Sequence, residues 1–258
     1  MATFNESGPI IRKSILSILN QDYKNLELIV GDDSTVKETI DTINTFAVQD
    51  PRVKIIRQMQ RMGFVPALNL ALQQAQGELI ARMDGDDIAM PDRISKQVAF
   101  SASHPEIAVF GGSMNIIDEN DNIISERHYP TTPAKLNVMF VFRSPFAHPT
   151  VMFRREIIDK GILYDPSYKK AEDIDFFMRI YKLGYNFGNL EDKLINYRVI
   201  KDFHRRRPKE QWKSNHRARK KFIPTRPFFS ILSYMVSWIY MYIPESIVSQ
   251  YYARENKI

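Results

Sequence analysis

The sequence contains no cysteine. Without thiols the chain can form neither a disulfide framework nor a metal site built on thiolates, although this leaves the redox compartment open. The N-terminal residues Met1 to Glu6 also lack the basic stretch and apolar core of a signal peptide. We therefore expect the main domain to lie in the cytoplasm.

The size and composition favour one main domain. The chain has 258 residues, and 44% of them are hydrophobic, which is enough for one sizeable core and an appendage. The net charge of +6 is unevenly distributed, because residues 201–221 hold ten Lys or Arg against two acids. That segment carries +8 and the remainder of the chain −2, so the basicity is a local patch.

The first third of the chain alternates between two periodicities. Short runs rich in branched residues read as strands, and the segments between them repeat apolar residues at helical spacing. The strand patterns lie at 26–31, 53–56 and 78–83, and the helical patterns at 9–19, 35–46 and 66–75. This alternation predicts an α/β fold with a mostly parallel sheet flanked by helices.

The second half has a different pattern. It predicts a helix from Pro91, a strand at 107–111, a hairpin around Asp118–Asn122, a strand at 150–153 and a helix from Glu172 to Leu183 that Gly184 ends. We expect acceptor specificity to reside in this half.

Acidic residues follow two of the predicted strands. Asp32 and Asp33 follow the first, and Asp84, Asp86 and Asp87 follow the run Leu79–Ala81. Ligands of parallel α/β sheets bind beyond the carboxyl ends of the strands, so both clusters should face one crevice. A divalent metal carrying phosphates would neutralise the second cluster. The alternative is that acids here decorate a turn and cap the Pro91 helix, for which Asp87 and Asp92 are better placed.

Several linked motifs resemble the inverting family 2 glycosyltransferases of the GT-A fold, many of whose bacterial members build surface polysaccharide. The resemblance covers about the first two hundred residues, and the combination of motifs is more specific than any one of them. The matching segments are 2–6, 29–35, 75–87, 90–93, 148–154, 172–177 and Tyr197-Arg198.

The resemblance implies a donor site. Asp84 and Asp86 match the family's D-x-D, whose acids hold Mg²⁺ or Mn²⁺ against the diphosphate of a sugar nucleotide. Thr3, Glu6, Asp33, Asp84 and Gly85 match nucleotide-binding positions, with Asp33 suited to a uracil or thymine N–H and Asp32 to orienting the loop. The same loop has a local interpretation, because Ser34 or Thr35 can cap the next helix.

It also implies a catalytic base. Asp173 matches the carboxylate that takes a proton from the acceptor hydroxyl, with Glu172 and His148 on the acceptor side. The alternatives are an ordinary acid at a helix N-terminus for Asp173 and a hydrogen-bonded structural residue for His148.

Two positions depart from the family pattern. Met1 stands where an apolar strand of about five residues should finish, so we expect a central strand to be missing or reduced. Ile200 stands where many members carry a histidine, and His204 is out of register.

The C-terminal part, 201–258, falls outside the resemblance, so we expect a catalytic domain at 1–200 and a basic, apolar tail. The uncharged stretch Phe228–Ile243 would span about 24 Å as a helix, short of a bilayer core of about 30 Å. Ser230, Ser233 and Ser237 form one polar stripe on it, and Trp and Tyr suit a lipid interface. We expect a peripheral or monotopic anchor on the anionic cytoplasmic face of the membrane. The alternatives are that the tail packs on the catalytic domain or that its basic segment binds nucleic acid. The basic segment contains no recognised nucleic-acid-binding module.

The sequence thus predicts a metal-dependent transferase that moves sugar from a UDP- or dTDP-sugar to a glycan or polyprenyl-diphosphate-linked acceptor. A nucleotidyltransferase is an alternative, but it would favour a glycine-rich phosphate loop that Gly8 alone does not supply. A second alternative is a membrane-associated pseudoenzyme that is impaired by the short N-terminal strand.

Overall fold

The computed structural model describes residues 1–58, 60–199, 208–221, 227–240 and 242. Its first third has the alternation that the sequence predicts, with boundaries that differ by a few residues. The elements are β1 (Ala2–Thr3), α1 (Gly8–Leu19), β2 (Leu28–Asp32), α2 (Lys37–Gln49), β3 (Val53–Arg57) and α3 (Phe64–Gln74).

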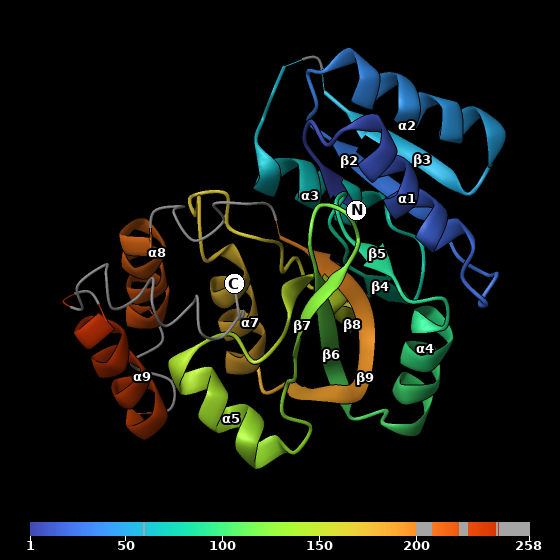
Figure 1. Ribbon diagram of the computed structural model, residues 1–258. Coiled ribbons are helices and arrows are strands. Elements are labelled where there is room, and N and C mark those ends of the chain that lie inside the picture. Colours follow the sequence, from blue (N-terminus) through green and yellow to red (C-terminus); the bar gives the residue numbers. More distant parts are fainter. Residues whose placement is uncertain (59, 200–207, 222–226, 241, 243–258) are drawn as a thin grey trace.

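These strands form a parallel sheet in the order β1-β2-β3, with Ala2 opposite Gly31 and Leu28 opposite Val53. The apolar faces of the predicted helices cover it, and Ile11, Ile15 and Ile43 are completely buried. Figure 1 shows α1 and α2 side by side at one end of the molecule, with α3 on the opposite side of the sheet.

A second, mixed sheet has the order β4-β8-β6-β9-β5 among the described residues, with β7 paired to β6. Only β6 and β9 run parallel here, and the other pairs are antiparallel. The predicted parallel pairing is therefore concentrated in the first sheet, because connections such as the Asp118–Asn122 hairpin reverse the chain. The strands are β4 (Leu79–Ala81), β5 (Ile88–Ala89), β6 (Ile107–Ile117), β7 (Ile123–Arg127), β8 (Met152–Arg154) and β9 (Asn186–Arg198).

The two-residue strand β1 joins the sheets. Ala2 lies opposite Gly31 on one side and forms a parallel bridge with Asp84 on the other. The Gly85 N–H donates to the Ala2 carbonyl at 3.1 Å. An N-terminal strand of two residues is thus present, and both acidic loops meet beside it.

The remaining helices surround the second sheet. They are α4 (Arg93–Ser103), α5 (Pro133–Phe142), α6 (Glu156–Asp159) and α7 (Glu172–Lys182), with a 3-10 turn at His148–Thr150. Aromatic rings fill the space between α7 and the sheet, where Phe176 contacts Phe153 and Phe177 contacts Phe146 edge to face. This packing fixes the start of α7 relative to the sheet.

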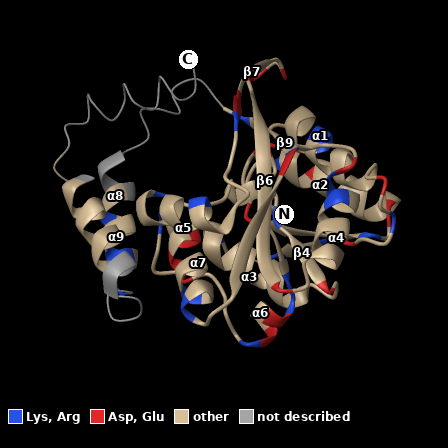
Figure 2. Ribbon diagram, turned by 90° about the horizontal axis from the view of Figure 1, so that it is seen from below, with Lys and Arg blue, Asp and Glu red and all other residues tan. Residues whose placement is uncertain are grey.

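Two further helices, α8 (Pro208–Lys220) and α9 (Pro227–Tyr240), belong to the tail. α8 packs on α7, and α9 packs on α8 and α5. Figure 2 shows this helical group at the end of the molecule opposite α1, α2 and α4. Within the described residues, we find no helix with the length and apolarity needed to cross a membrane.

Candidate active site

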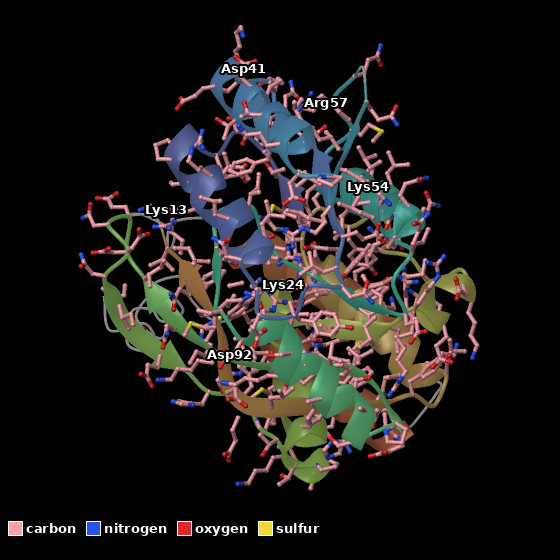
Figure 3. The ribbon with its side chains drawn as sticks, turned by 90° about the vertical axis from the view of Figure 1, so that its right-hand side faces the viewer. Lys13, Lys24, Asp41, Lys54, Arg57 and Asp92 are labelled. Carbon is pink, nitrogen blue, oxygen red and sulfur yellow. The ribbon has the colours of Figure 1, made fainter. Side chains whose placement is uncertain are left out.

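Three carboxylates meet in the turn between β4 and β5. One oxygen from each of Asp84, Asp86 and Asp87 lies within 4.8 Å of the others. The sequence predicts Asp84 and Asp86 as the metal ligands, and only its alternative interpretation uses Asp87 to cap the helix that follows. That alternative is wrong for Asp87. Asp87 is completely buried and accepts the Arg198 backbone N–H at 2.9 Å. Asp92 occupies the N-cap position of α4 without a side-chain cap, and it pairs with Lys96 at 2.8 Å (Figure 3).

The carboxylates repel one another in a poorly solvated place. Burial, followed by the charges of Asp84 and Glu6, raises the pKa of Asp86 to about 7. Burial, followed by the charges of Asp84 and Asp86, raises the pKa of Asp87 well above its ordinary value. Asp87 Oδ2 is buried and has no hydrogen-bond partner among the described residues. Three neighbouring carboxylates, two of them half-buried and one fully buried, are a set of oxygen atoms that fits Mg²⁺ or Mn²⁺.

Arg82 partly compensates this charge. Its guanidinium forms a two-pronged ion pair with Asp84, in which Nη1 donates to Oδ2 at 2.6 Å and Nη2 contacts Oδ1. The side chain is only 4% exposed and lies 5.6 Å from the Phe64 ring centroid. The sequence motifs do not identify this residue, although an arginine directly after the apolar run Leu79–Ala81 was a visible signal.

Arg198, from the predicted Tyr197-Arg198 motif, holds the acidic turn in place. Its Nε donates to the Asp86 carbonyl at 2.9 Å and its Nη1 to the Asp118 carbonyl at 3.0 Å. It also pairs with Asp121, which binds Lys13 of α1 (Figure 3). The end of β9, the β6–β7 hairpin and α1 thereby determine where the Asp86 backbone lies.

Thr3, Glu6 and Gly85 form one contact group. The Thr3 hydroxyl donates to Glu6 Oε2 at 2.6 Å, and the Phe4 N–H donates to the same oxygen at 2.9 Å. A Cβ on Gly85 would lie 3.0 Å from the Thr3 Cβ and 3.2 Å from Glu6. A larger residue at this position would therefore require Thr3 and Glu6 to shift by a few tenths of an ångström, and glycine lets the D-x-D turn approach these two predicted nucleotide-binding side chains without that shift.

Asp32 and Asp33 organise the neighbouring loops. Asp32 pairs with Arg57 and accepts the Ser34 N–H at 2.9 Å, as its predicted orienting role requires. The Asp33 carboxylate accepts the N–H groups of Met62 and Gly63 at 2.9 and 3.0 Å. In this ligand-free structure Asp33 thus holds the 61–63 loop, and its contact with a base stays a prediction.

The start of α2 is capped from another part of the chain. The sequence favours Ser34 or Thr35 as its cap, but the helix begins at Lys37 and has no side-chain cap of its own. Instead, Asn5 Oδ1 accepts the N–H groups of Thr35 and Val36 at 2.7 and 2.9 Å. The local cap prediction is wrong because a distant amide satisfies these donors.

Glu172 and Asp173, the residues predicted for the acceptor side and the base, begin α7. Both are partly buried, and Ala171 before them has the left-handed φ of 61°. Burial, followed by the charge of Asp173, raises the pKa of Glu172 to about 7. Burial also raises the pKa of Asp173 above its ordinary value. A proton acceptor of this kind operates near neutral pH.

His148 lies beside Tyr164, a residue that the sequence motifs miss. The His148 Nε2 and the Tyr164 hydroxyl are 2.8 Å apart, and the Tyr164 ring stacks on Phe176. Burial lowers the pKa of His148 well below its ordinary value, so the imidazole is neutral. His148 is therefore hydrogen-bonded as its structural interpretation requires, and its acceptor role stays a prediction. Ile200 and His204 lie outside the described residues.

Arg82 links the two sides of the site electrostatically. Its charge lowers the pKa of Asp86 on the predicted donor side and of both Glu172 and Asp173 on the predicted acceptor side. One arginine thus acts on the predicted metal ligands and on the predicted base, which are far apart in sequence.

Comparison with known proteins agrees with this architecture. The profile described as Glycosyl transferase family 2 matches residues 1–162. The O-antigen biosynthesis glycosyltransferase WbnJ of Escherichia coli is 35% identical over 190 residues, which cover 72% of this chain and 73% of WbnJ.

Solved structures share the fold at lower identity. The mannosyltransferase PcManGT from Pyrobaculum calidifontis, in complex with GDP-Man and Mn²⁺, has a TM-score of 0.69 at 19% identity. The match covers 98% of this chain and 73% of the PcManGT chain. S. aureus TarS 1–349, in complex with UDP-GlcNAc, has a TM-score of 0.66 at 20% identity and covers 90% and 68%. The match spans 40% of the longer TarS chain. On the profile match, the relative and the shared fold, this chain belongs to glycosyl transferase family 2 and is a GT-A glycosyltransferase.

Proposed function

We propose that this glycosyltransferase is metal-dependent and inverting, and that it transfers a sugar from a UDP- or dTDP-sugar to a glycan or polyprenyl-diphosphate-linked acceptor in cell-surface polysaccharide synthesis. The observation that carries the proposal is the acid triad Asp84, Asp86 and Asp87, whose partner Arg82 also lowers the pKa of Glu172 and Asp173 through its charge. The O-antigen role named for WbnJ and the nucleotide-sugar complexes of the structural neighbours support it.

The donor side is built for a metal-bound diphosphate. Asp84 and Asp86, with Asp87 beside them, would hold Mg²⁺ or Mn²⁺ through carboxylate oxygens. Such a cation, when bound, offsets the charge that develops on the leaving diphosphate. Thr3, Glu6 and Gly85 form the adjacent wall, against which the nucleoside would lie.

Asp173 acts as the general base. It takes the proton of the acceptor hydroxyl while that oxygen bonds to the anomeric carbon and the bond from this carbon to the diphosphate breaks. Attack from the face opposite the leaving group inverts the anomeric configuration. Its partial burial keeps it from being fully solvated, and the raised pKa makes the carboxylate a stronger proton acceptor than an ordinary aspartate.

Calorimetric titration with UDP, dTDP and GDP, each with and without Mn²⁺, tests the donor site. We expect metal-dependent binding of UDP or dTDP that Asp86→Asn abolishes, and that Asp92→Asn retains as a control on the same segment. Binding of GDP alone would contradict the donor class. Nucleotide binding without sugar transfer or donor hydrolysis would favour the pseudoenzyme alternative. The family match already favours sugar transfer over nucleotidyl transfer.

A further inference from the structure

The helix α9 buries polar side chains and exposes apolar ones, which is the reverse of an ordinary surface helix. Ser233 and Ser237 are each only 4% exposed, whereas Met235 and Ile239 are each 53% exposed and Trp238 is 49% exposed. A helix on a soluble domain normally buries its apolar stripe and exposes its polar one. Two serines of the predicted stripe, Ser233 and Ser237, therefore face the protein, and the Ser230 side chain lies outside the part that the structure describes.

Polar partners from two other helices fix this orientation. Buried Arg219 of α8 donates from Nη1 to the Phe140 and Val141 carbonyls at 2.8 and 2.9 Å and also to the Ser233 hydroxyl. His216 Nδ1 and the Ser237 hydroxyl are 3.0 Å apart. A buried guanidinium needs acceptors, and Ser233 supplies one only if the serine stripe faces inward.

Some basic side chains of the α8 region contact the domain, and others are exposed to solvent. Arg217 reaches Ser167 and Lys221 reaches Asp165 and Asp175, so these side chains attach α8 to the domain. Lys213 and Lys220 are exposed and take part in no ion pair among the described residues. Two lysines of the helix that carries α9 are therefore available to an anionic partner.

We propose that the outer face of α9 rests on an anionic lipid bilayer, with Lys213 and Lys220 beside the phospholipid headgroups. The outer face consists of Ile231, Leu232, Met235, Trp238, Ile239 and, just beyond the helix, Tyr242. This places the enzyme as a monotopic protein at the cytoplasmic membrane face, and it rests on the proposed function in that a lipid-linked acceptor resides there.

The dimensions favour a bilayer over a second copy of the chain. Fourteen residues of helix are about 21 Å long, and a face one helix wide covers on the order of 200–300 Å². A stable protein interface needs about 800 Å² from each partner. In a symmetric dimer the exposed lysines of the two copies would face and repel one another. Trp and Tyr side chains beside lysines are instead suited to the lipid headgroup region.

This attachment connects the bilayer to the catalytic residues. α9 packs on α8, and α8 packs on α7, which begins with Glu172 and Asp173 (Figure 2). Two successive helix contacts of 8–10 Å place α7 within about 20 Å of the surface on which α9 would rest. Arg219, which orients α9, also lowers the pKa of Asp173 through its charge.

Trp238 provides the reporter for the test. The chain has two tryptophans, so Trp212→Phe leaves Trp238 alone. This protein, without nucleotide, is titrated with vesicles of phosphatidylcholine, with and without phosphatidylglycerol, and with brominated lipid as a quencher. We expect a blue shift and quenching that require the anionic lipid and weaken with salt.

Matched variants separate the two components of the surface. Met235→Gln with Ile239→Gln should lower vesicle partitioning about tenfold or more, whereas Val48→Gln, at a still more exposed apolar site on α2, should not change it. Lys213→Gln and Lys220→Gln should each lower it about fivefold, and Lys37→Gln on α2 should leave it unchanged. Because all these side chains are exposed, thermal unfolding should be unaffected.

Three results would overturn the proposal: no spectral shift with anionic vesicles, binding that the outer-face variants do not weaken, or a lipid-independent dimer in which Trp238 is buried. Vesicle binding is measured without a donor, so its failure is distinct from a failure of the UDP titration.

Discussion

Arg82 and Asp84 lie two residues apart and form a two-pronged ion pair, so the first acid of the D-x-D is already held by an internal cation in the absence of metal. The same arginine influences the acceptor-side acids. It therefore contributes to the charge balance of both groups of acids.

Replacing Arg82 should make stability depend on the metal. In Arg82→Met three neighbouring acids lose their counter-charge, and we expect a loss of about 3–5 kcal/mol of unfolding free energy in EDTA. Saturating Mn²⁺ should restore much of it, because the cation supplies the missing charge. Denaturant unfolding in the two conditions measures this. Arg61→Met, at a pair whose arginine is 59% exposed, should lose less than about 1 kcal/mol in both. An equal loss for Arg82→Met with and without Mn²⁺ would contradict the prediction.

Asp173→Asn should abolish transfer while leaving donor binding intact. Loss of a general base lowers kcat by about 10²–10⁴-fold. UDP affinity in Mn²⁺ should remain within about twofold of the wild type, because Asp173 lies on the acceptor side. Steady-state kinetics and calorimetry on the same preparation test both parts. Glu172→Gln is the matched control, and a larger kcat loss there than in Asp173→Asn would move the base to Glu172.

Glu172 should make the protein less stable as the pH rises. Its pKa is raised from 4.5 to about 7, so the folded state retains a proton that the unfolded state loses first. Stability from this group is complete below pH 4.5 and is lost as the pH rises to 7. In Glu172→Gln, the free energy of unfolding should fall by on the order of 2 kcal/mol less than in the wild type over this rise in pH. Urea unfolding between pH 5 and about 8 measures it.

The control for this pH effect is Glu191→Gln, at an exposed position on β9. Its stability profile should follow that of the wild type. If Glu172→Gln also follows the wild type, the raised pKa is not a stability determinant.

Arg219→Met should release α9 from the domain. The change leaves the Phe140 and Val141 carbonyls and the Ser233 hydroxyl without their shared donor, and we expect a loss of about 2–4 kcal/mol. Hydrogen exchange should rise first in α5 and α9. Arg217→Met, which removes an exposed contact to Ser167, should cost less than about 1 kcal/mol. Unchanged exchange in α9 would show that other contacts hold it.

Local motifs were sufficient to predict the acidic turn. Asp84 and Asp86 were identified from residues within a few positions of them, and the structure places their carboxylates beside that of Asp87. Asp173 was identified in the same way, and its catalytic role stays a prediction. The sequence did not reveal the role of Arg198, whose Nε binds the Asp86 carbonyl 112 positions away. The Tyr164 partner of His148 was equally invisible, because no local pattern pairs a histidine with a tyrosine sixteen residues on.

By itself, the sequence determined the alternating α/β elements, the acidic turn, the start of α7 and the serine stripe of α9, because each depends on periodicity or spacing within a single segment. Only the tertiary structure decided that Asp87 is buried against the Arg198 backbone, that Asn5 caps α2, and that Ser233 and Ser237 of α9 face inward. The physical reason is the same in each case. A buried polar group must find a partner, and here that partner comes from a distant part of the chain.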